Sequence, residues 1–177
     1  MPLSEILGKH GDVIRSVTGL NGKLSIADMT KYISELTRVN LLNGTSATDK
    51  ELEVNHGDWR SEVCTISLNK GIYTFSVETY NNTGTSITLR VENKTGKARG
   101  VLNNVGDTNW GLIPIEWLDS TQRKNMNIAF EVYQPGTIFL GFSGNPFTDG
   151  NITYRKPMLN TGTLPLPYTS NTLGGGS

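Results

Sequence analysis

The sequence predicts an all-β protein, an antiparallel β-sandwich, with one helix ahead of it. Two observations indicate the sandwich. Hydrophobic and polar residues alternate in several short runs after residue 39, and these runs are bounded by turn sequences such as NKG, NNTG, NKTG, QPG and TDGN. Short alternating strands at this density are typical of two antiparallel sheets packed face to face. A third observation, a run with helical spacing before residue 39, indicates the helix.

The first 38 residues form a separate predicted part. In KLSIADMTKYISELTR, the hydrophobic residues that recur at the spacing of one helix face are Ile26, Met29, Ile33 and Leu36. Ser25 is a suitable N-cap, with Asp28 three residues later. We expect a helix over about residues 25–36. Such a short helix is marginal alone in water, so its hydrophobic face must pack on something, and we interpret residues 1–38 as a connector.

Residues 39–170 carry the period of two that strands require. The clearest alternating runs are residues 71–80, 85–93 and 126–133, and residues 137–143 and 151–159 continue the series. We expect ten side chains to lie between the sheets: Tyr73, Phe75, Val77, Ile87, Leu89, Val91, Ile128, Phe130, Val132 and Leu140. The single cysteine, Cys64, alternates with Ile66 and Leu68, which predicts a small buried side chain rather than a reactive thiol.

Composition narrows the class of protein. The chain has 177 residues with 16 basic and 16 acidic side chains, so we expect no nucleic-acid partner. We also expect no membrane insertion, because the hydrophobic runs are far shorter than the roughly 20 residues that span a bilayer. MPLSEILGKHGD does not resemble a signal peptide. Abundant Asn, Thr, Ser and Gly are typical of extracellular or virion β-proteins. Residues 171–177, NTLGGGS, read as a flexible linker or tag remnant.

Motifs for catalysis are missing from the sequence, so we expect no catalytic residues. His10 and His56 have no partner at a metal-ligand spacing, and we expect no metal site. A structural calcium ion is the one cofactor that we keep open, although no DxDxDG-type loop is present. Glu78 and Glu131 could form the carboxylate pair of a glycosidase. A salt bridge to Arg90 on the same polar face is the simpler interpretation.

The remaining acidic side chains suggest no site. We interpret five of them as solvated loop charges: Glu51, Glu53, Asp58, Asp119 and Asp149.

Aromatic residues outside the core pattern predict a saccharide-binding groove. Sugar rings stack on flat aromatic rings, while their hydroxyl groups need planar donors and acceptors. Trp59 and Trp110 follow the polar stretches HGD and GDTN, and Tyr80 and Tyr133 end strands on the polar face. The predicted ligand-binding residues, in order of preference, are Trp110, Trp59, Tyr80, Tyr133, Arg90, Glu78 and Glu131. The alternative is that each ring simply caps an end of the sandwich.

Two further aromatic residues, Trp117 and Tyr154, bear on this prediction. Trp117 is assigned to the core or its rim. Tyr154, which precedes Arg155, is counted with the rings outside the core.

Several motifs in order resemble a known family. Five stretches resemble jelly-roll carbohydrate-binding modules, most of all those inserted in tail and baseplate proteins of phages that infect Gram-positive bacteria. These stretches are NLLNGTS, GDW, GIYTFSVETYNNTGT, MNIAFEVYQPGTIFLGF and ITYRKPMLNTGTLPLPYT. These include evolved distal tail proteins and receptor-binding proteins. LNGKLSIADMTKYISEL is similar to the connector helix that precedes such modules. The resemblance covers roughly residues 19–170, and Tyr168 stands where the family often has tryptophan.

The resemblance implies a non-catalytic module that recognises saccharide on the host cell wall. Its implied partners are a host cell-surface polysaccharide and other tail or baseplate proteins, and its implied location is the virion, outside the cell. Two alternatives stay open. One is a purely structural tail or virion decoration domain, and the other is an accessory binding domain of a secreted polysaccharide-degrading enzyme.

Overall fold

The computed structural model describes residues 40–54, 60–82, 86–101, 105–108, 111–114, 117–118, 121, 123–144 and 150–170. The chain divides into two units, Met1–Val39 and Asn40–Ser177, and all of the described residues belong to the second. The helix predicted at residues 25–36 and the linker predicted at residues 171–177 lie outside them. Within the described ranges, no helix has the length and hydrophobicity needed to cross a membrane.

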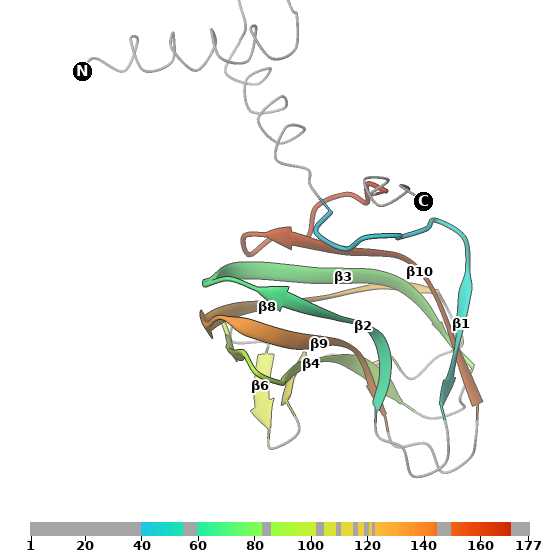
Figure 1. The fold of residues 1–177 in the computed structure, drawn as a ribbon. Coiled ribbons are helices and arrows are strands. Elements are labelled where there is room, and N and C mark those ends of the chain that lie inside the picture. Colours follow the sequence, from blue (N-terminus) through green and yellow to red (C-terminus); the bar gives the residue numbers. More distant parts are fainter. Residues whose placement is uncertain are drawn as a thin grey trace, which may run out of the picture. The chain divides into compact units, whose positions relative to one another are not determined.

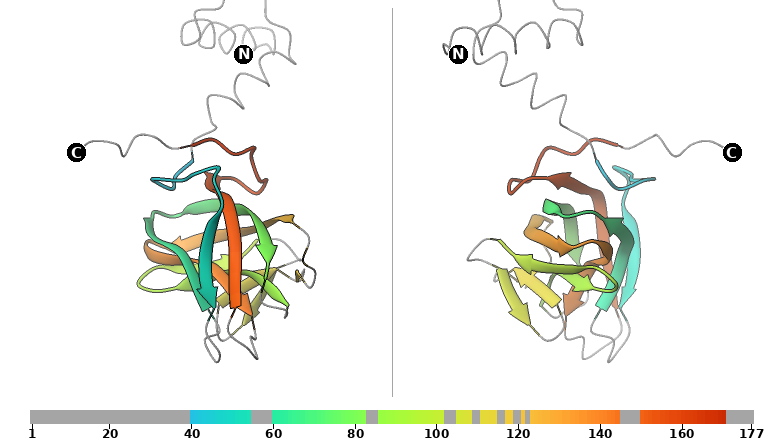
Figure 2. Two further views of the ribbon diagram at one scale, coloured as in Figure 1. Left: turned by 90° about the vertical axis from the view of Figure 1, so that its right-hand side faces the viewer. Right: turned by 60° about the vertical axis from the view of Figure 1, so that its left-hand side comes forward.

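Ten strands form two five-stranded antiparallel sheets, in agreement with the predicted β-sandwich (Figures 1 and 2). Sheet A has the order β1 (Lys50–Val54), β10 (Gly150–Thr161), β3 (Gly71–Asn81), β8 (Lys124–Gln134) and β5 (Lys97–Gly100). Sheet B has the order β2 (Arg60–Leu68), β9 (Gly136–Gly144), β4 (Ile87–Asn93), β7 (Gly111–Pro114) and β6 (Val105–Thr108).

Consecutive strands alternate between the two sheets. This holds from β1 to β6 and again from β7 to β10, while β6 and β7 are neighbours within sheet B. The first and last strands pair with each other, Lys50 lying opposite Tyr154. The two ends of the sandwich therefore meet at one edge of sheet A, where Figure 2 shows β1 and β10 side by side.

The hydrophobic core lies between the sheets and confirms the predicted period of two. All ten side chains expected inside are buried, and Phe75, Leu89 and Phe130 are 0% exposed. Phe75 and Phe130 come from sheet A and Leu89 from sheet B, so both sheets contribute. Tyr154 also belongs to this core, with its ring centroid 6.2 Å from that of Phe142, which corrects its assignment to the rings outside the core.

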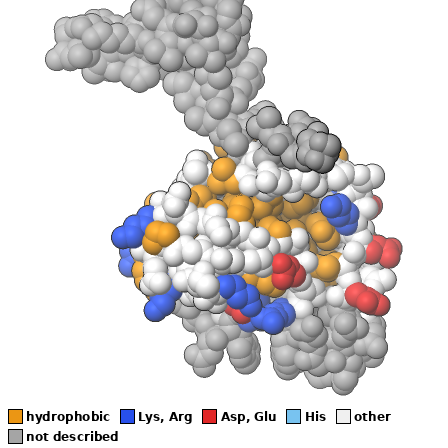
Figure 3. Space-filling model, in the orientation of Figure 1, with side chains coloured by type: hydrophobic (Ala, Val, Ile, Leu, Met, Phe, Trp, Pro, Cys, Tyr) orange, Lys and Arg blue, Asp and Glu red, His pale blue; other side chains and the backbone are white. Residues whose placement is uncertain are grey.

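The side of the sandwich where β1 and β2 form the sheet edges is partly hydrophobic. Figure 3 shows hydrophobic side chains across this side. Five residues pack on the core while remaining partly accessible: Leu41, Leu52, Val63, Cys64 and Ile66. Burial raises the pKa of the Cys64 thiol to about 12, so the thiol is protonated at neutral pH.

Of the predictions near the surface, one differs from the structure, one agrees with it and one falls outside the described residues. Glu51 and Glu53 belong to the edge strand β1 rather than to a loop. Trp117 is 39% exposed, next to the bridge between Leu118 and Ile87, and so lies at the rim of the core. Asp58, Asp119 and Asp149 lie outside the described residues.

Candidate functional site

A groove of about 500 Å³ lies on the face of sheet A that is turned away from sheet B. Its floor comes from β3 and β8, where Ser76 pairs with Asn127 and Glu78 with Asn125. These four polar residues alternate along the strands with the buried Val77 and Met126. The alternation that builds the core on one face of sheet A therefore builds a polar floor on the other. The described residues that line the groove are Ser76, Val77, Glu78, Asn125, Met126, Asn127, Lys156, Pro165, Leu166, Pro167 and Tyr168.

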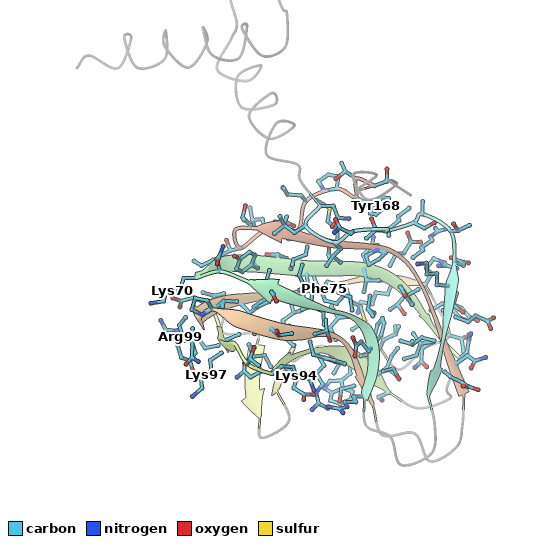
Figure 4. The ribbon with its side chains drawn as sticks, in the orientation of Figure 1. Lys70, Phe75, Lys94, Lys97, Arg99 and Tyr168 are labelled. Carbon is cyan, nitrogen blue, oxygen red and sulfur yellow. The ribbon has the colours of Figure 1, made fainter. Side chains whose placement is uncertain are left out.

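The segment after β10 forms one wall of the groove. It contains PLPY, residues 165–168, in which the two prolines favour an extended backbone. Figure 4 shows Tyr168 on the side of β3 and β10 that is away from sheet B. The Tyr168 hydroxyl donates to Thr45 Oγ1 at 3.3 Å, which anchors the far end of the ring.

Asn160 ties this wall to β10. Its side chain is 1% exposed. Nδ2 donates to the carbonyl of Leu164 at 3.0 Å, and Oδ1 accepts from the Leu166 amide at 3.3 Å. A buried side-chain amide that bonds the backbone at both ends of a turn fixes the path of this segment, which pairs with no strand among the described residues.

Asn40 ties the beginning of the sandwich to the same segment. It is 2% exposed, and its Nδ2 donates to the carbonyls of Pro157 and Thr169, each at 3.0 Å. Its Oδ1 accepts from the amides of Leu42 and Leu159, each at 3.1 Å. The asparagine of the NLL motif is thus a buried clamp between the entry and the exit of the domain.

Glu78 is the centre of an ion-pair network at the groove. Arg155 Nη2 and Lys156 Nζ donate to its two carboxylate oxygens, the lysine at 3.0 Å, and Arg123 Nε lies at 3.7 Å. Arg123 also forms a bidentate pair with Asp49, at 2.9 and 3.0 Å. The hydrogen bond from Arg155 is the main cause that holds the pKa of Glu78 below its usual value, with Lys156 acting in the same direction. Glu78 is therefore an ionised acceptor rather than a proton donor.

Of the predicted ligand-binding residues, Glu78 lines the groove, and Tyr80 follows it on the same face as a half-buried ring. Glu131 and Tyr133 share this face but lie toward the other end of β8. Glu131 pairs with Ile72, six residues from Glu78 along β3, which corresponds to roughly 20 Å. Arg99, from β5, bonds Glu131 at 2.7 Å and lies 5.8 Å from the ring of Tyr133. The predicted residues of sheet A therefore do not form one cluster.

Arg90 belongs to the other sheet, so the expectation that it lies beside Glu78 and Glu131 is wrong. It lies on β4, whose neighbours are β9 and β7. It is 6% exposed and pairs with Glu92 at 2.9 Å, and Glu92 also accepts from Arg60 and Lys94. The alternation of consecutive strands between sheets explains the error, because β3 and β4 follow each other in sequence but lie in different layers. Trp59 and Trp110 lie outside the described residues.

Sequence reasoning did not include most of the groove in the predicted site. Asn125 and Asn127 carried a usable signal, since they alternate with Met126 and Ile128 and must face away from the core. Only the pairing of β3 with β8 places them beside Ser76 and Glu78. Lys156 gave no such signal, because regular alternation would turn it away from the face that holds Arg155.

A metal site has no support in this part of the chain, and calcium remains only a prediction. No group of three or more His, Cys, Asp or Glu side chains that could hold a metal ion occurs among the described residues.

Comparisons of the chain with models of protein families, with curated proteins and with solved structures found no match.

Proposed function

We propose that residues 40–170 are a non-catalytic carbohydrate-binding module of a phage tail protein, which recognises a saccharide of the host cell wall. The groove on sheet A is the observation that carries this proposal, because it combines an aromatic and aliphatic wall with a floor of planar polar side chains. Its volume of about 500 Å³ falls within the range of roughly 300–1,000 Å³ that small-molecule sites occupy.

The two surfaces of the groove match the two surfaces of a sugar ring. Tyr168 and Leu166 supply an apolar surface for the C–H face of a pyranose. On the floor, the amides of Asn125 and Asn127 can both donate and accept, and the ionised Glu78 accepts, which suits a ligand rich in hydroxyl groups. Glu78 is the one carboxylate among the described residues that line the groove, whereas most glycosidases use a pair. This supports binding rather than hydrolysis.

The topology and the motifs support the same proposal. We interpret the alternation of strands between sheets, closed by the pairing of β1 with β10, as a jelly roll. The resemblance of NLLNGTS and of ITYRKPMLNTGTLPLPYT to modules of phage tail and baseplate proteins supports a location in the virion. On this proposal the partners are a host cell-surface polysaccharide and other tail or baseplate proteins.

Binding by one groove should be weak. A shallow site that holds uncharged hydroxyl groups gives micromolar to millimolar dissociation constants, which correspond to binding free energies of about 4 to 8 kcal/mol. Several copies on a tail tip would act together along a repeating polymer, so avidity would provide stable adsorption.

The test is a glycan array of microbial saccharides probed with the full chain, and with Tyr168→Ala and Tyr133→Ala variants. We expect the parent to bind a defined set of glycans. Loss of the Tyr168 ring should weaken binding by about 1 to 3 kcal/mol, by analogy with base stacking on aromatic rings. Tyr133 is a matched control, since it is exposed on the same sheet but does not line the groove.

A parent that binds no glycan would favour a purely structural domain. Binding that depends on Tyr133 and not on Tyr168 would place the site elsewhere on sheet A.

A further inference from the structure

Two consecutive cations, Arg155 and Lys156, reach the same carboxylate. In a regular strand, neighbouring side chains point to opposite faces, so one of the two would point toward the core. Here β10 has a register irregularity between Arg155 and Met158, and both side chains bond Glu78 on the groove side of sheet A. A bulge re-aims side chains in this way.

The backbone at Lys156 is unfavourable for a lysine. Its φ is +53°, in the left-handed region, and it is the only non-glycine residue with positive φ among the described residues. It also precedes Pro157, and a residue before proline favours an extended conformation. The Lys156 amide donates to the carbonyl of Ser46 at 2.8 Å, which helps to hold this conformation. Strained positions of this kind persist where the surrounding structure enforces them, and they concentrate at binding sites.

The network around Glu78 has more donors than acceptors. Arg123, Arg155 and Lys156 surround two carboxylates, those of Glu78 and Asp49, which leaves one net positive charge. All four oxygens of the two carboxylates already accept hydrogen bonds. Lys156 uses one of its three N–H donors on Glu78. The Arg155 Nε atom is buried and has no hydrogen-bond acceptor among the described residues, with Asp49 Oδ1 3.9 Å away.

The cations also lie closer to solvent than the carboxylate they share. The side chains of Arg155 and Lys156 are 33% and 38% exposed, against 13% for Glu78. A ligand in the groove therefore meets the Lys156 ammonium group, which has N–H donors beyond the one that binds Glu78, before it meets the Glu78 carboxylate.

We propose that the saccharide bound in this groove carries a negatively charged substituent, a carboxylate or a phosphate, which Lys156 binds, with the positive charge of Arg155 beside it. The proposal rests on the proposed function and names the class of glycan. The substituent supplies further hydrogen-bond acceptors, since all four carboxylate oxygens of Glu78 and Asp49 are already in use. The bulge at Lys156 places a second cation on this face, where regular alternation would provide only one.

The test is an array that holds neutral, carboxylated and phosphorylated microbial glycans, with methyl-esterified and dephosphorylated forms of the charged ones. We expect the parent chain to bind charged glycans and to lose binding when the matching group is esterified or removed, and the two treatments tell carboxylate from phosphate. Lys156→Gln should weaken binding about tenfold, and Lys156→Arg should retain it. Lys97→Gln is the control, because Lys97 is exposed on sheet A well apart from Tyr168 (Figure 4).

Equal binding of neutral and charged forms, or a Lys156→Gln variant that binds like the parent, would overturn the proposal while leaving saccharide binding in place. An array on which the parent binds nothing would overturn the proposed function itself.

Discussion

Replacing Lys156 with glycine and with alanine separates the backbone strain at this position from the contacts of its side chain. Both variants lose the hydrogen bond to Glu78, which is worth about 0.2–1 kcal/mol for a partly exposed pair. Alanine keeps the cost of a left-handed backbone, about 1–2 kcal/mol, whereas glycine removes it. Glycine also loosens the unfolded chain, which costs about 0.4–1 kcal/mol. Lys156→Gly should therefore be close to the parent in stability and about 1 kcal/mol more stable than Lys156→Ala.

Urea unfolding followed by circular dichroism measures this difference in unfolding free energy. In thermal melts, the melting temperatures of the two variants should differ by roughly 3 °C. The slope of the unfolding free energy with urea concentration should be the same for both variants, since neither changes the surface that unfolding exposes. If Lys156→Ala were as stable as Lys156→Gly, the left-handed backbone at this position would store no strain, and the prediction would be wrong.

Three further predictions concern the wall of the groove, the network beside it and the single thiol. Asn160→Ala should lower the unfolding free energy by about 1–3 kcal/mol and weaken saccharide binding, because the backbone groups of Leu164 and Leu166 lose their buried partner. A variant that melts and binds like the parent would show that the wall is held by other contacts. Because the pKa of Glu78 is lowered in the folded state, its contribution to stability is complete above the ordinary value of 4.5 and is lost as the pH falls through the lowered value. Glu78→Gln should therefore weaken the dependence of the unfolding free energy on pH in the acid range. An unchanged pH dependence would contradict the ion pairs assigned to Glu78. Cys64, with its pKa raised to about 12, should react far more slowly with Ellman's reagent at pH 8 than it does after urea unfolds the chain, and equally rapid reaction of the folded protein would contradict the raised pKa.

The core could be predicted from sequence because its signal is local. Phe75 and Phe130 each stand in a long run of strict alternation, and a face that must be buried fixes which side chains point inward. The short strands β5, β6 and β7 have four residues each, too few for a period to be recognised. The edge strand β1 reads KELEV, whose charges suggested a loop, although charged residues are a common device on exposed sheet edges.

The groove could be predicted only in part because it depends on contacts between distant segments. Glu78 was assigned to a polar face, but its partners Arg155 and Lys156 lie 77 and 78 residues further along the chain. The pairing of β3 with β10 and β8, rather than with β4, decides which polar residues meet. Arg90 was misplaced for this reason, because no local pattern tells which sheet a strand joins. Lys156 faces the groove only because of a bulge, and a bulge breaks the alternation on which the prediction relied.

The most direct measurement is a nuclear magnetic resonance titration of the full chain, labelled with nitrogen-15, with a glycan that the array identifies. We expect the largest shift changes in the side-chain amide signals of Asn125 and Asn127 and in the backbone amides of Ser76 and Tyr168, which line the groove from three separate segments. Changes confined to the strands of sheet B, around Arg90 and Glu92, would show that the saccharide binds the opposite face and would contradict the assignment of the groove as the binding site.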